Sequence, residues 1–351
     1  MDTRILSVKT DGIEQVSRAF SEVMEAGGIA AFPTETVYGL GGNGLSPDAA
    51  KKIYAAKGRP SDNPLILHIG KREQLDALVK KVPEDAERLM AAFWPGPLTL
   101  IFQKADVVPF ETTGGLSTVA IRMPSDPTAN RLLSDCRLPV AAPSANLSGR
   151  PSPTSFRHVQ EDLFGRADLL IDGGDAKIGL ESTILDLSGE VPTLLRPGYI
   201  TMEALASVIG EVRMDPALER ENIISGRFKD VRPKAPGMKY RHYAPKAPLT
   251  IVEGTPEEVT QAISRAADEN TGILTTEEHR DAYQIGQVLS VGRLSDPESI
   301  AHSLFSVLRA FDDLGVTKIY AEDLSSADIG TAVMNRLLKA AGGSVKNAED
   351  L

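Results

Sequence analysis

The feature that most constrains the fold of this chain is a repeated alternation of short apolar runs with longer stretches of helical pattern. The stretches 11–28 and 46–58 have helical periodicity and end in glycine, as helices commonly do. Apolar runs of strand length in the same region are 27–33, 64–69, 97–102, 117–123, 139–145, 167–174 and 182–188. Short strands interspersed with helices predict an α/β domain over residues 1–210.

A second block of the same kind occupies residues 247–351. Its strand-like runs are 248–254, 271–276, 287–292 and 318–324, and its helical stretches are 256–269, 299–315 and 330–343. Helices between successive strands favour parallel pairing. The sequence therefore predicts a smaller, Rossmann-like α/β domain at the C-terminal end.

The two blocks are joined by residues 211–246, which are rich in proline and in basic side chains. From Arg227 to Lys246 there are seven lysines and arginines and one acidic residue. Each proline restricts its own φ and the residue before it, so we expect a semi-extended linker.

Charge and cysteine content exclude several classes of protein. The 351 residues include 38 Lys and Arg against 48 Asp and Glu, a formal net charge of -10. Broad, non-specific nucleic-acid binding needs a cationic surface, which this balance argues against, although a local basic site for an anionic substrate stays open. The single cysteine, Cys136, excludes an internal disulfide and a multi-thiolate metal site, and it makes the cytoplasm the expected compartment. No apolar run approaches the ~20 residues of a membrane span, and we expect no signal peptide.

Two cations flank a glycine directly after the stretch 46–58. Lys57 and Arg59 can be favourable charges at a helix C-terminus, which is a common arrangement. Together with Gly58 and the turn at Asn63 they also fit a preformed phosphate clamp, which combines a point charge with a planar fork. The residues alone leave both interpretations open.

Further polar residues lie at the ends of predicted strands, where α/β sites gather. His68 is either a hydrogen-bonded core residue or a ligand-binding one. Arg122 can pair with a substrate carboxylate or form a surface ion pair. Ser182 precedes a strand and Arg196 follows one, and neither is distinctive alone.

The loop after the run 139–145 is crowded with small hydroxyl and amide side chains. Ser144, Asn146, Ser148 and Ser152 suit phosphate or ribose recognition, and equally an ordinary turn. No G-x-S-x-G motif surrounds Ser144, which argues against a nucleophilic serine.

The glycines Gly39, Gly41 and Gly44 fit the dinucleotide fingerprint G-x-G-x-x-G only weakly, because the segment PTETVY separates them from the preceding strand. A tight glycine turn before a helix, or a substrate loop in which Thr34 and Thr36 face a ligand, are the alternatives. The five histidines have no metal-ligand spacing, and there is no P-loop motif.

Taken in order, the segments PTETVYGLG, KGRPSDNPL, FWPGPLT, VAIRMPSD, PSANLSG, ESTILDL and RPG resemble the YrdC family. The basic segment PGMKYRHYAPKAPL and the second α/β block resemble its two-domain form, the threonylcarbamoyl-AMP synthases. The resemblance covers almost the whole chain and implies a twisted mixed sheet with helices for the first domain. It also implies the substrates L-threonine, bicarbonate or CO2, and ATP with Mg2+, and the products threonylcarbamoyl-AMP and pyrophosphate.

In the family, partner proteins then transfer the threonylcarbamoyl group to an adenosine beside the anticodon of tRNA. The resemblance therefore implies downstream transfer proteins as partners, while the acidic charge argues against stable tRNA binding by this chain. It implies no resident metal site and no membrane.

The resemblance also assigns site residues. It gives the catalytic Lys-x-Arg motif to Lys57 and Arg59. It assigns the threonine to Thr36, His68, Arg122 and Ser182. It assigns ATP to Arg59, Asn63, Thr118, Ser144, Asn146, Ser152 and Arg196, and to Tyr240 in the linker.

The linker carries its own hypothesis. Tyr240, Arg241 and His242 lie in a basic segment braced by prolines and long enough to reach back over the first domain. We expect it to cover the ATP site as a lid that excludes water, and a passive tether is the alternative.

Two other functions are weighed against the synthase. One is an RNA-binding module without catalysis, against which the acidic charge counts. The other is a carbamoyltransferase of the hydrogenase-maturation type, which also carries a YrdC-like domain. Those enzymes carry a zinc finger as well, for which the one cysteine leaves no room.

Overall fold

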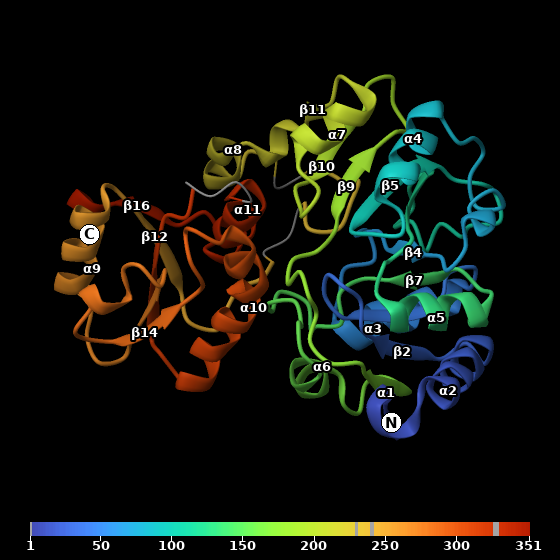
Figure 1. Cartoon of the computed structure of the whole chain (residues 1–351), viewed down its shortest axis with the longest axis horizontal. Coiled ribbons are helices and arrows are strands. Elements are labelled where there is room, and N and C mark those ends of the chain that lie inside the picture. The colour runs from blue at the N-terminus through green and yellow to red at the C-terminus, as the bar shows by residue number, and fades with distance from the viewer. Residues whose placement is uncertain (1, 229–230, 239–241, 326–329) are drawn as a thin grey trace.

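The computed structural model describes residues 2–228, 231–238, 242–325 and 330–351. Figure 1 shows two bodies side by side, with the N-terminal elements in one and the C-terminal elements from β12 onward in the other. Each body is built on its own sheet, one of eleven strands and one of five. The α/β class predicted for both blocks is confirmed. Among the described residues, no helix combines the length and apolar character that a membrane crossing requires.

The first sheet is mixed and runs in the order β1-β8-β2-β3-β7-β4-β6-β5-β9-β10-β11. Its strands are β1 (Arg4–Ser7), β2 (Ile29–Phe32), β3 (Gly39–Asn43), β4 (Ile66–His68), β5 (Leu98–Gln103), β6 (Thr118–Arg122), β7 (Val140–Ala142), β8 (Leu169–Asp172), β9 (Thr183–Asp186), β10 (Thr193–Arg196) and β11 (Arg213–Met214). Parallel pairs such as β4 with β6 alternate with antiparallel pairs such as β5 with β6. Strands far apart in the sequence therefore meet in the middle of the sheet.

The helices of this body are α1 (Val8–Asp11), α2 (Ile13–Glu25), α3 (Pro47–Lys57), α4 (Glu84–Phe93), α5 (Pro127–Cys136), α6 (Phe156–Leu163) and α7 (Met202–Ile209). The start and stop signals of the stretch 46–58 are confirmed in α3. Ser46 caps the helix by accepting a hydrogen bond from the Ala49 N–H, Pro47 begins it, and Gly58 ends it at φ +62°.

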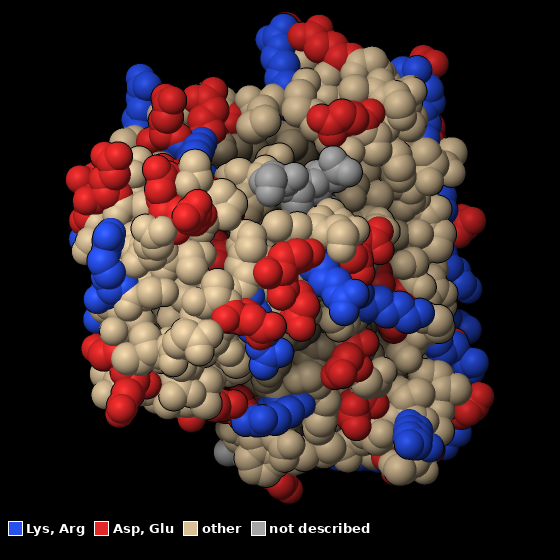
Figure 2. All heavy atoms as spheres, turned by 60° about the vertical axis from the view of Figure 1, so that its left-hand side comes forward, with Lys and Arg blue, Asp and Glu red and all other residues tan. Residues whose placement is uncertain are grey.

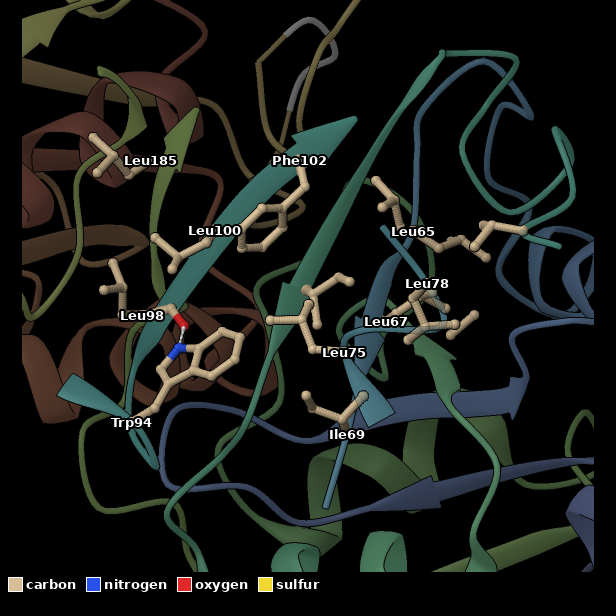
Figure 3. Packing of buried hydrophobic residues seen from close by; sticks show 14 of the residues in the cluster. Leu65, Leu67, Ile69, Leu75, Leu78, Trp94, Leu98, Leu100, Phe102 and Leu185 are labelled. Carbon is tan, nitrogen blue, oxygen red and sulfur yellow. Dashed lines mark hydrogen bonds between the residues drawn. The ribbon is translucent and has the colours of Figure 1, made fainter. Parts of the chain in front are cut away.

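One face of the first sheet is covered by α3, α4, α6 and α7, which together with the strands form the largest apolar core. In Figure 3, Leu67 of β4 lies across from Leu98, Leu100 and Phe102 of β5. Trp94 closes one end of this core, and its indole N–H donates to the Leu98 carbonyl over 2.7 Å. Burying these side chains supplies the main stabilisation of the body.

The opposite face of the sheet is covered in two separate parts. At the β1–β8–β2 end, α2 and α5 pack on it. Over the central strands, Ile66, Ala120 and Ile184 pack instead against Ala235 and Met238 of the joining segment. The middle of this face thus lies between two helices and an irregular stretch of chain.

Most of the glycine-rich segment is a strand, and the turn that the sequence offers as one alternative begins only at Gly44, just before α3. Residues 39–43 form β3 between β2 and β7. A Cβ at Gly41 would lie 2.5 Å from Val140 Cγ1, and one at Gly44 would lie 2.3 Å from Leu67 Cδ2. Glycine is needed here because neighbouring side chains pack directly onto the strand, and neither residue needs a positive φ.

The second body is a parallel sheet in the order β14-β13-β15-β12-β16, as the helix-separated strands predict. Its elements are β12 (Leu249–Glu253), α9 (Pro256–Ala266), β13 (Thr271–Thr275), β14 (Gln287–Ser290), α10 (Pro297–Leu314), β15 (Lys318–Glu322), α11 (Gly330–Ala340) and β16 (Val345–Asn347). Figure 1 shows α10 and α11 on the side that faces the first body.

The joining region contains more structure than the expected semi-extended linker. Its first part pairs β11 with β10 of the first sheet and forms a short helix, α8 (Arg220–Ser225), that packs against α11. The proline and basic signal is concentrated from Arg227 onward, so it does not describe the stretch before that residue.

Candidate active site

A cavity opens on the less covered face of the first sheet, between the α2–α5 side and the joining segment. Nine of the residues that the sequence assigns to the site line it: Thr36, Arg59, His68, Arg122, Ser144, Asn146, Ser152, Ser182 and Arg196. Segments that are far apart in the chain therefore meet at one place.

Strand alternation explains why the strand-borne residues meet on this face. His68 lies two residues after Ile66, and Arg122 two residues after Ala120, so each points to the same side as its apolar neighbour. Because β4 and β6 are parallel with His68 opposite Arg122, both side chains reach the same edge. Ser182 precedes β9 on the side of Ile184.

Arg122 is held in a buried network. Its Nη1 donates to Thr36 Oγ1 over 2.8 Å, and its Nε donates to the Gly96 carbonyl over 3.2 Å. Its Nη2 forms an ion pair with Glu35 Oε1 at 2.7 Å. Arg122 is only 3% exposed, so the alternative of a surface ion pair is wrong.

Glu35 is a site residue that the sequence reasoning missed, although it lies beside Thr36 in the PTETVYG motif. Burial by itself would raise the pKa of this carboxyl, but Arg122 and the Ser125 N–H outweigh that effect and lower it. Glu35 is therefore a charged group that fixes the guanidinium of Arg122.

His68 is buried at the cavity, and its Nδ1 lies 3.1 Å from the Ile66 carbonyl. Burial and the nearby charge of Arg122 lower the pKa of His68 to about 3. The ring is therefore neutral at physiological pH, and it offers a hydrogen-bonding group rather than a charge.

Arg196 and Ser182 form one unit. A register shift in β10 between Leu194 and Arg196 turns Arg196 toward the cavity, where its Nε donates to the Ser182 carbonyl over 2.9 Å. Its Nη2 donates to Ser182 Oγ over 3.0 Å, and Ser182 Oγ lies 2.7 Å from Thr99 Oγ1. A residue assigned to ATP and one assigned to threonine are thus in direct contact.

Lys57 lies behind the cavity wall. Its Nζ donates to the carbonyls of Ser144 and Asn146, and Ser144 Oγ donates to Asn146 Oδ1 over 2.5 Å. Burial, and then the charge of Arg59, lower the pKa of Lys57 well below its usual range. Lys57 therefore holds the Ser-x-Asn turn in shape in this conformation, and direct contact with phosphate stays a prediction.

The remaining ATP assignments are distributed differently. The Arg59 guanidinium lines the cavity and donates to the carbonyls of Asn63 and Pro64. Asn63 does not line it, and its buried Oδ1 has no hydrogen-bond partner among the described residues. Thr118 begins β6 and so lies roughly 13 Å along the strand from Arg122, away from the cavity. Tyr240 lies outside the described residues.

Glu181, next to Ser182 in the ESTILDL motif, was also missed by the sequence reasoning. It lines the cavity and accepts a hydrogen bond of 2.5 Å from Ser152 Oγ. Burial alone would raise the pKa of Glu181, but Arg336 and then Arg196 outweigh it and lower the value. Its acidic side chain inside a motif of polar residues was the signal available in the sequence.

The joining segment closes one side of the cavity. Pro236, Gly237, His242 and Tyr243 are part of its lining, and Arg196 Nη1 donates to the Pro236 carbonyl over 3.4 Å. Burial, and then the charges of Arg59 and other cations, lower the pKa of His242 well below its usual range. Arg241 lies outside the described residues.

The cavity is electropositive. Its lining holds three arginines against one carboxylate within the part of the chain that the structure describes. Burial lowers the pKa of Arg196 to about 10, although the nearby Tyr243 and Glu181 act to raise it. Guanidinium groups at a cavity bind phosphate and carboxylate groups, so the arrangement suits such anions. In the described residues no group of three or more His, Cys, Asp or Glu side chains could hold a metal ion.

Comparisons with known proteins agree across both bodies. A family model described as "Telomere recombination" (Sua5_yciO_yrdC) matches residues 22–198, and one described as the C-terminal domain of threonylcarbamoyl-AMP synthase matches residues 200–342. The threonylcarbamoyl-AMP synthase of Bacillus subtilis is 50% identical over 320 residues, which is 90% of either chain. A Pseudomonas putida protein of the same name is 36% identical over 187 residues, 52% of this chain and 97% of its own.

Among solved structures, Sua5 of Pyrococcus abyssi in complex with L-threonine superposes with a TM-score of 0.87. That protein is 43% identical, and the superposition covers 99% of both chains. The similarity therefore includes both bodies and their relative placement, and not only the first sheet.

Proposed function

Because the chain belongs to the threonylcarbamoyl-AMP synthase family, in its two-domain form, we propose that it makes threonylcarbamoyl-AMP and pyrophosphate from L-threonine, bicarbonate or CO2, and ATP. Membership of that family makes the chain an enzyme, a transferase of the nucleotidyltransferase type that belongs to tRNA modification. The substrates and the order of chemical steps are the proposal.

The observation that carries the proposal is that three buried arginines line one cavity. Arg59, Arg122 and Arg196 line it together with small hydroxyl residues such as Ser144 and Ser152. A triphosphate and an amino-acid carboxylate are the anionic groups of the proposed substrates, and planar guanidinium groups bind both in bidentate fashion.

The proposed chemistry begins at the threonine amine, which forms a C–N bond to CO2 with loss of a proton, or to bicarbonate with loss of water, and so gives a carbamate. A carbamate oxygen then attacks the α-phosphorus of ATP, a new P–O bond forms, and pyrophosphate leaves with the electrons of the broken bond. Such a displacement depends on positioning and on charge neutralisation more than on a strong base. A rigid, electropositive cavity is suited to both.

In this scheme Arg122 binds the threonine carboxylate, and Glu35 and Thr36 hold its guanidinium in place. The neutral ring of His68 and the hydroxyl of Ser182 contact the rest of the amino acid. The contact between Arg196 and Ser182 brings the two substrate halves together. The structure of the Pyrococcus abyssi relative contains L-threonine, which supports threonine as the amino acid.

On the nucleotide side, Arg59 and Arg196 neutralise phosphate oxygens while Ser144, Asn146 and Ser152 supply polar contacts. Lys57 supports this set by fixing the turn at Ser144. We expect Mg2+ to enter with ATP as part of the substrate, where it bridges phosphate oxygens and adds positive charge.

The product would then pass to separate proteins that modify an adenosine beside the tRNA anticodon. We expect no stable tRNA binding by this chain, because its net charge is -10. Figure 2 supports this for the face that it shows, where acidic and basic side chains are interspersed and neither sign forms a continuous patch. The cytoplasm, where a single buried thiol stays reduced, is the expected compartment.

Mass detection of threonylcarbamoyl-AMP tests the proposal directly. The full chain is incubated with threonine, bicarbonate and MgATP, and omission of each substrate serves as a control. We expect a product whose carbonyl carbon carries the label of 13C-bicarbonate, together with one pyrophosphate for each product. ATP hydrolysis that does not depend on threonine, or no product at all, would refute the proposed function.

A second test concerns the lid. The cavity encloses about 60 Å3, well below the ~300–1,000 Å3 of ligand pockets, so entry of ATP requires the wall to move. Pro236, Gly237, His242 and Tyr243 form that wall, which supports a lid over a passive tether. Deletion of residues 236–243 should reduce turnover strongly while the first body stays folded, as circular dichroism can verify. Unchanged turnover and ATP affinity would refute the lid.

A further inference from the structure

The second body contributes a buried charge that lies behind the lining of the cavity. Arg336 of α11 is fully buried, and the hydrogen bonds that its guanidinium makes to described residues all go to the first body. Its Nε lies 3.2 Å from Glu181 Oε2, its Nη2 donates to the Glu181 carbonyl over 3.4 Å, and its Nη1 donates to the Pro197 carbonyl. Arg336 thus contacts the carboxylate of Glu181. It also contacts the backbone carbonyls of Glu181, next to Ser182, and of Pro197, next to Arg196.

Glu181 in turn connects Arg336 to the substrate cavity. Its Oε1 accepts the hydrogen bond from Ser152, and it precedes Ser182, which contacts Arg196. Arg336 is not part of the cavity lining, so it reaches the substrates only through these residues.

From this geometry we propose that Arg336 is a positioning residue for the reaction, which acts through Glu181 to fix Ser152 and Arg196 in their ATP-binding arrangement. This inference rests on the proposed function for the identity of the nucleotide. It gives the second body a defined task, which is to complete the support of a cavity formed mainly by the first.

The charges around Glu181 explain why Arg336 is needed for this arrangement. The groups facing it are Arg336 and Lys339 of α11, Arg196 of β10, Lys57 of α3 and Tyr243 of the joining segment. Loss of Arg336 removes its hydrogen-bonded ion-pair partner, so burial then raises the pKa of Glu181. Glu181 would either take a proton or draw Arg196 away from Ser182. Either change would disturb the arrangement of Ser152 and Arg196 that is proposed to bind ATP.

The test compares Arg336→Gln with the wild type in two measurements, the KM for ATP in pyrophosphate release and the Kd of ATP without threonine. We expect both constants to rise about 10- to 100-fold, the size of effect seen when a supporting residue is removed, with a smaller change in kcat. Arg336→Lys keeps the positive charge but loses the planar, two-pronged guanidinium. Its KM and Kd for ATP should therefore lie between those of the wild type and those of Arg336→Gln. If Arg336→Gln fails to fold, Arg336→Lys and Glu181→Gln carry the same comparison.

The pH dependence of kcat/KM distinguishes a positioning role from a purely structural one, because loss of stability alone would leave its shape unchanged. In Arg336→Gln, kcat/KM for ATP should fall on acidification at pH values where the wild type is level, because Glu181 becomes protonated there. Adding Glu181→Gln should remove that fall and should cost little more ATP affinity, since the two residues act as one unit. Full additivity of the two substitutions would overturn the inference.

Ile263→Ala is the matched control. Ile263 of α9 is fully buried, and it packs in an apolar cluster formed by residues of the second body. Its truncation should lower the melting temperature without changing the ATP constants or the pH profile. An Arg336→Gln variant that behaves like Ile263→Ala would overturn the inference. A wild type that binds ATP but makes no product would refute the proposed function alone, and one that binds no ATP would refute both.

Discussion

The two sheets of this molecule each carry a cluster of buried polar side chains at strand ends, and the clusters differ in their charge balance. In the second body, the Glu322 carboxylate at the end of β15 accepts hydrogen bonds from Thr275 over 2.7 Å and from Tyr283 over 2.6 Å. Its other oxygen lies 2.9 Å from His279 Nδ1. One charge is thus surrounded by hydrogen-bond donors from its own domain.

The cluster of the first body gathers three arginines around a cavity with a single carboxylate in the lining. Glu35 pairs with Arg122 from behind the lining. Burial, and then the charge of Arg59, lower the pKa values of Lys57 and His242 nearby. Hydrogen-bond satisfaction therefore does not separate a structural cluster from a functional one. Several cationic side chains that line one cavity do.

If the cluster of the first body is functional, the largest loss of activity is expected for Arg122→Met. The substitution removes the proposed partner of the threonine carboxylate and leaves Glu35 buried without its ion pair. We expect kcat/KM for threonine to fall by about 10²- to 10³-fold, since truncating one partner of a buried pair costs ~2–5 kcal/mol. The measurement is pyrophosphate release at varied threonine concentration.

Arg122→Met combined with Glu35→Gln is the control for that loss. The double variant no longer contains an unpaired buried carboxylate, so it should regain stability in thermal unfolding while its threonine activity stays low. A threonine kcat/KM close to that of the wild type in either variant would remove Arg122 from the site.

The residues of this cavity were largely predictable from the sequence, whereas their supports were not. Thr36, His68, Arg122 and Ser182 were assigned through the resemblance of their motifs to the YrdC family, whereas the residues alone left their roles open. Glu35 lies within such a motif too, but its pairing with Arg122 depends on a sheet that joins distant segments. The spacing of residues along the chain does not indicate which distant residues will pair.

The second body shows the same limit more strongly. Its parallel sheet followed from the helix-separated runs, yet nothing in the segment GTAVMNRLLKAAGG distinguishes Arg336 from an ordinary exposed arginine of a helix. Its burial arises only when α11 packs against the first body. Docking between domains is a property of two surfaces, so one-dimensional patterns predict the elements and not their contact.

The strand errors have a similar physical origin. β3 was not predicted as a strand, since the alternatives for its glycines were a tight turn and a substrate loop. Its strand conformation depends on side chains that pack onto it from neighbouring strands. The short edge strands β1, β11 and β16 were not predicted, because they lack the apolar runs that mark the central strands.

If the Glu322 cluster of the second body is structural, Glu322→Ala should lower stability and leave activity nearly unchanged. Tyr283 and Thr275 would lose their acceptor, which should cost about 2–3 kcal/mol of unfolding free energy. Activity measured below the melting transition should stay within about twofold of the wild type. Glu322→Gln keeps an acceptor oxygen and should cost less. A raised KM for either substrate would show that this cluster is functional after all.

The smallest effect concerns the pH dependence of stability at His68. The pKa of His68 is lowered to about 3 in the folded chain, whereas an unfolded chain has a histidine pKa of about 6.5. Between these values the unfolded state binds one more proton than the folded state, so stability is lost as the pH falls from 6.5. The loss attributable to this one ring is about 1.4 kcal/mol for each pH unit.

His68→Asn removes that ring but keeps a hydrogen-bonding side chain near the Ile66 carbonyl. Its unfolding free energy, measured in urea at pH 7 and pH 5.5, should decrease less on acidification than that of the wild type. His158, whose pKa is lowered to about 4, and His242 still titrate in the variant, so the slope should be shallower and not zero. An identical slope in both proteins would mean that His68 is protonated in the folded state. The electropositive cavity would then hold a fourth charge instead of a neutral ring.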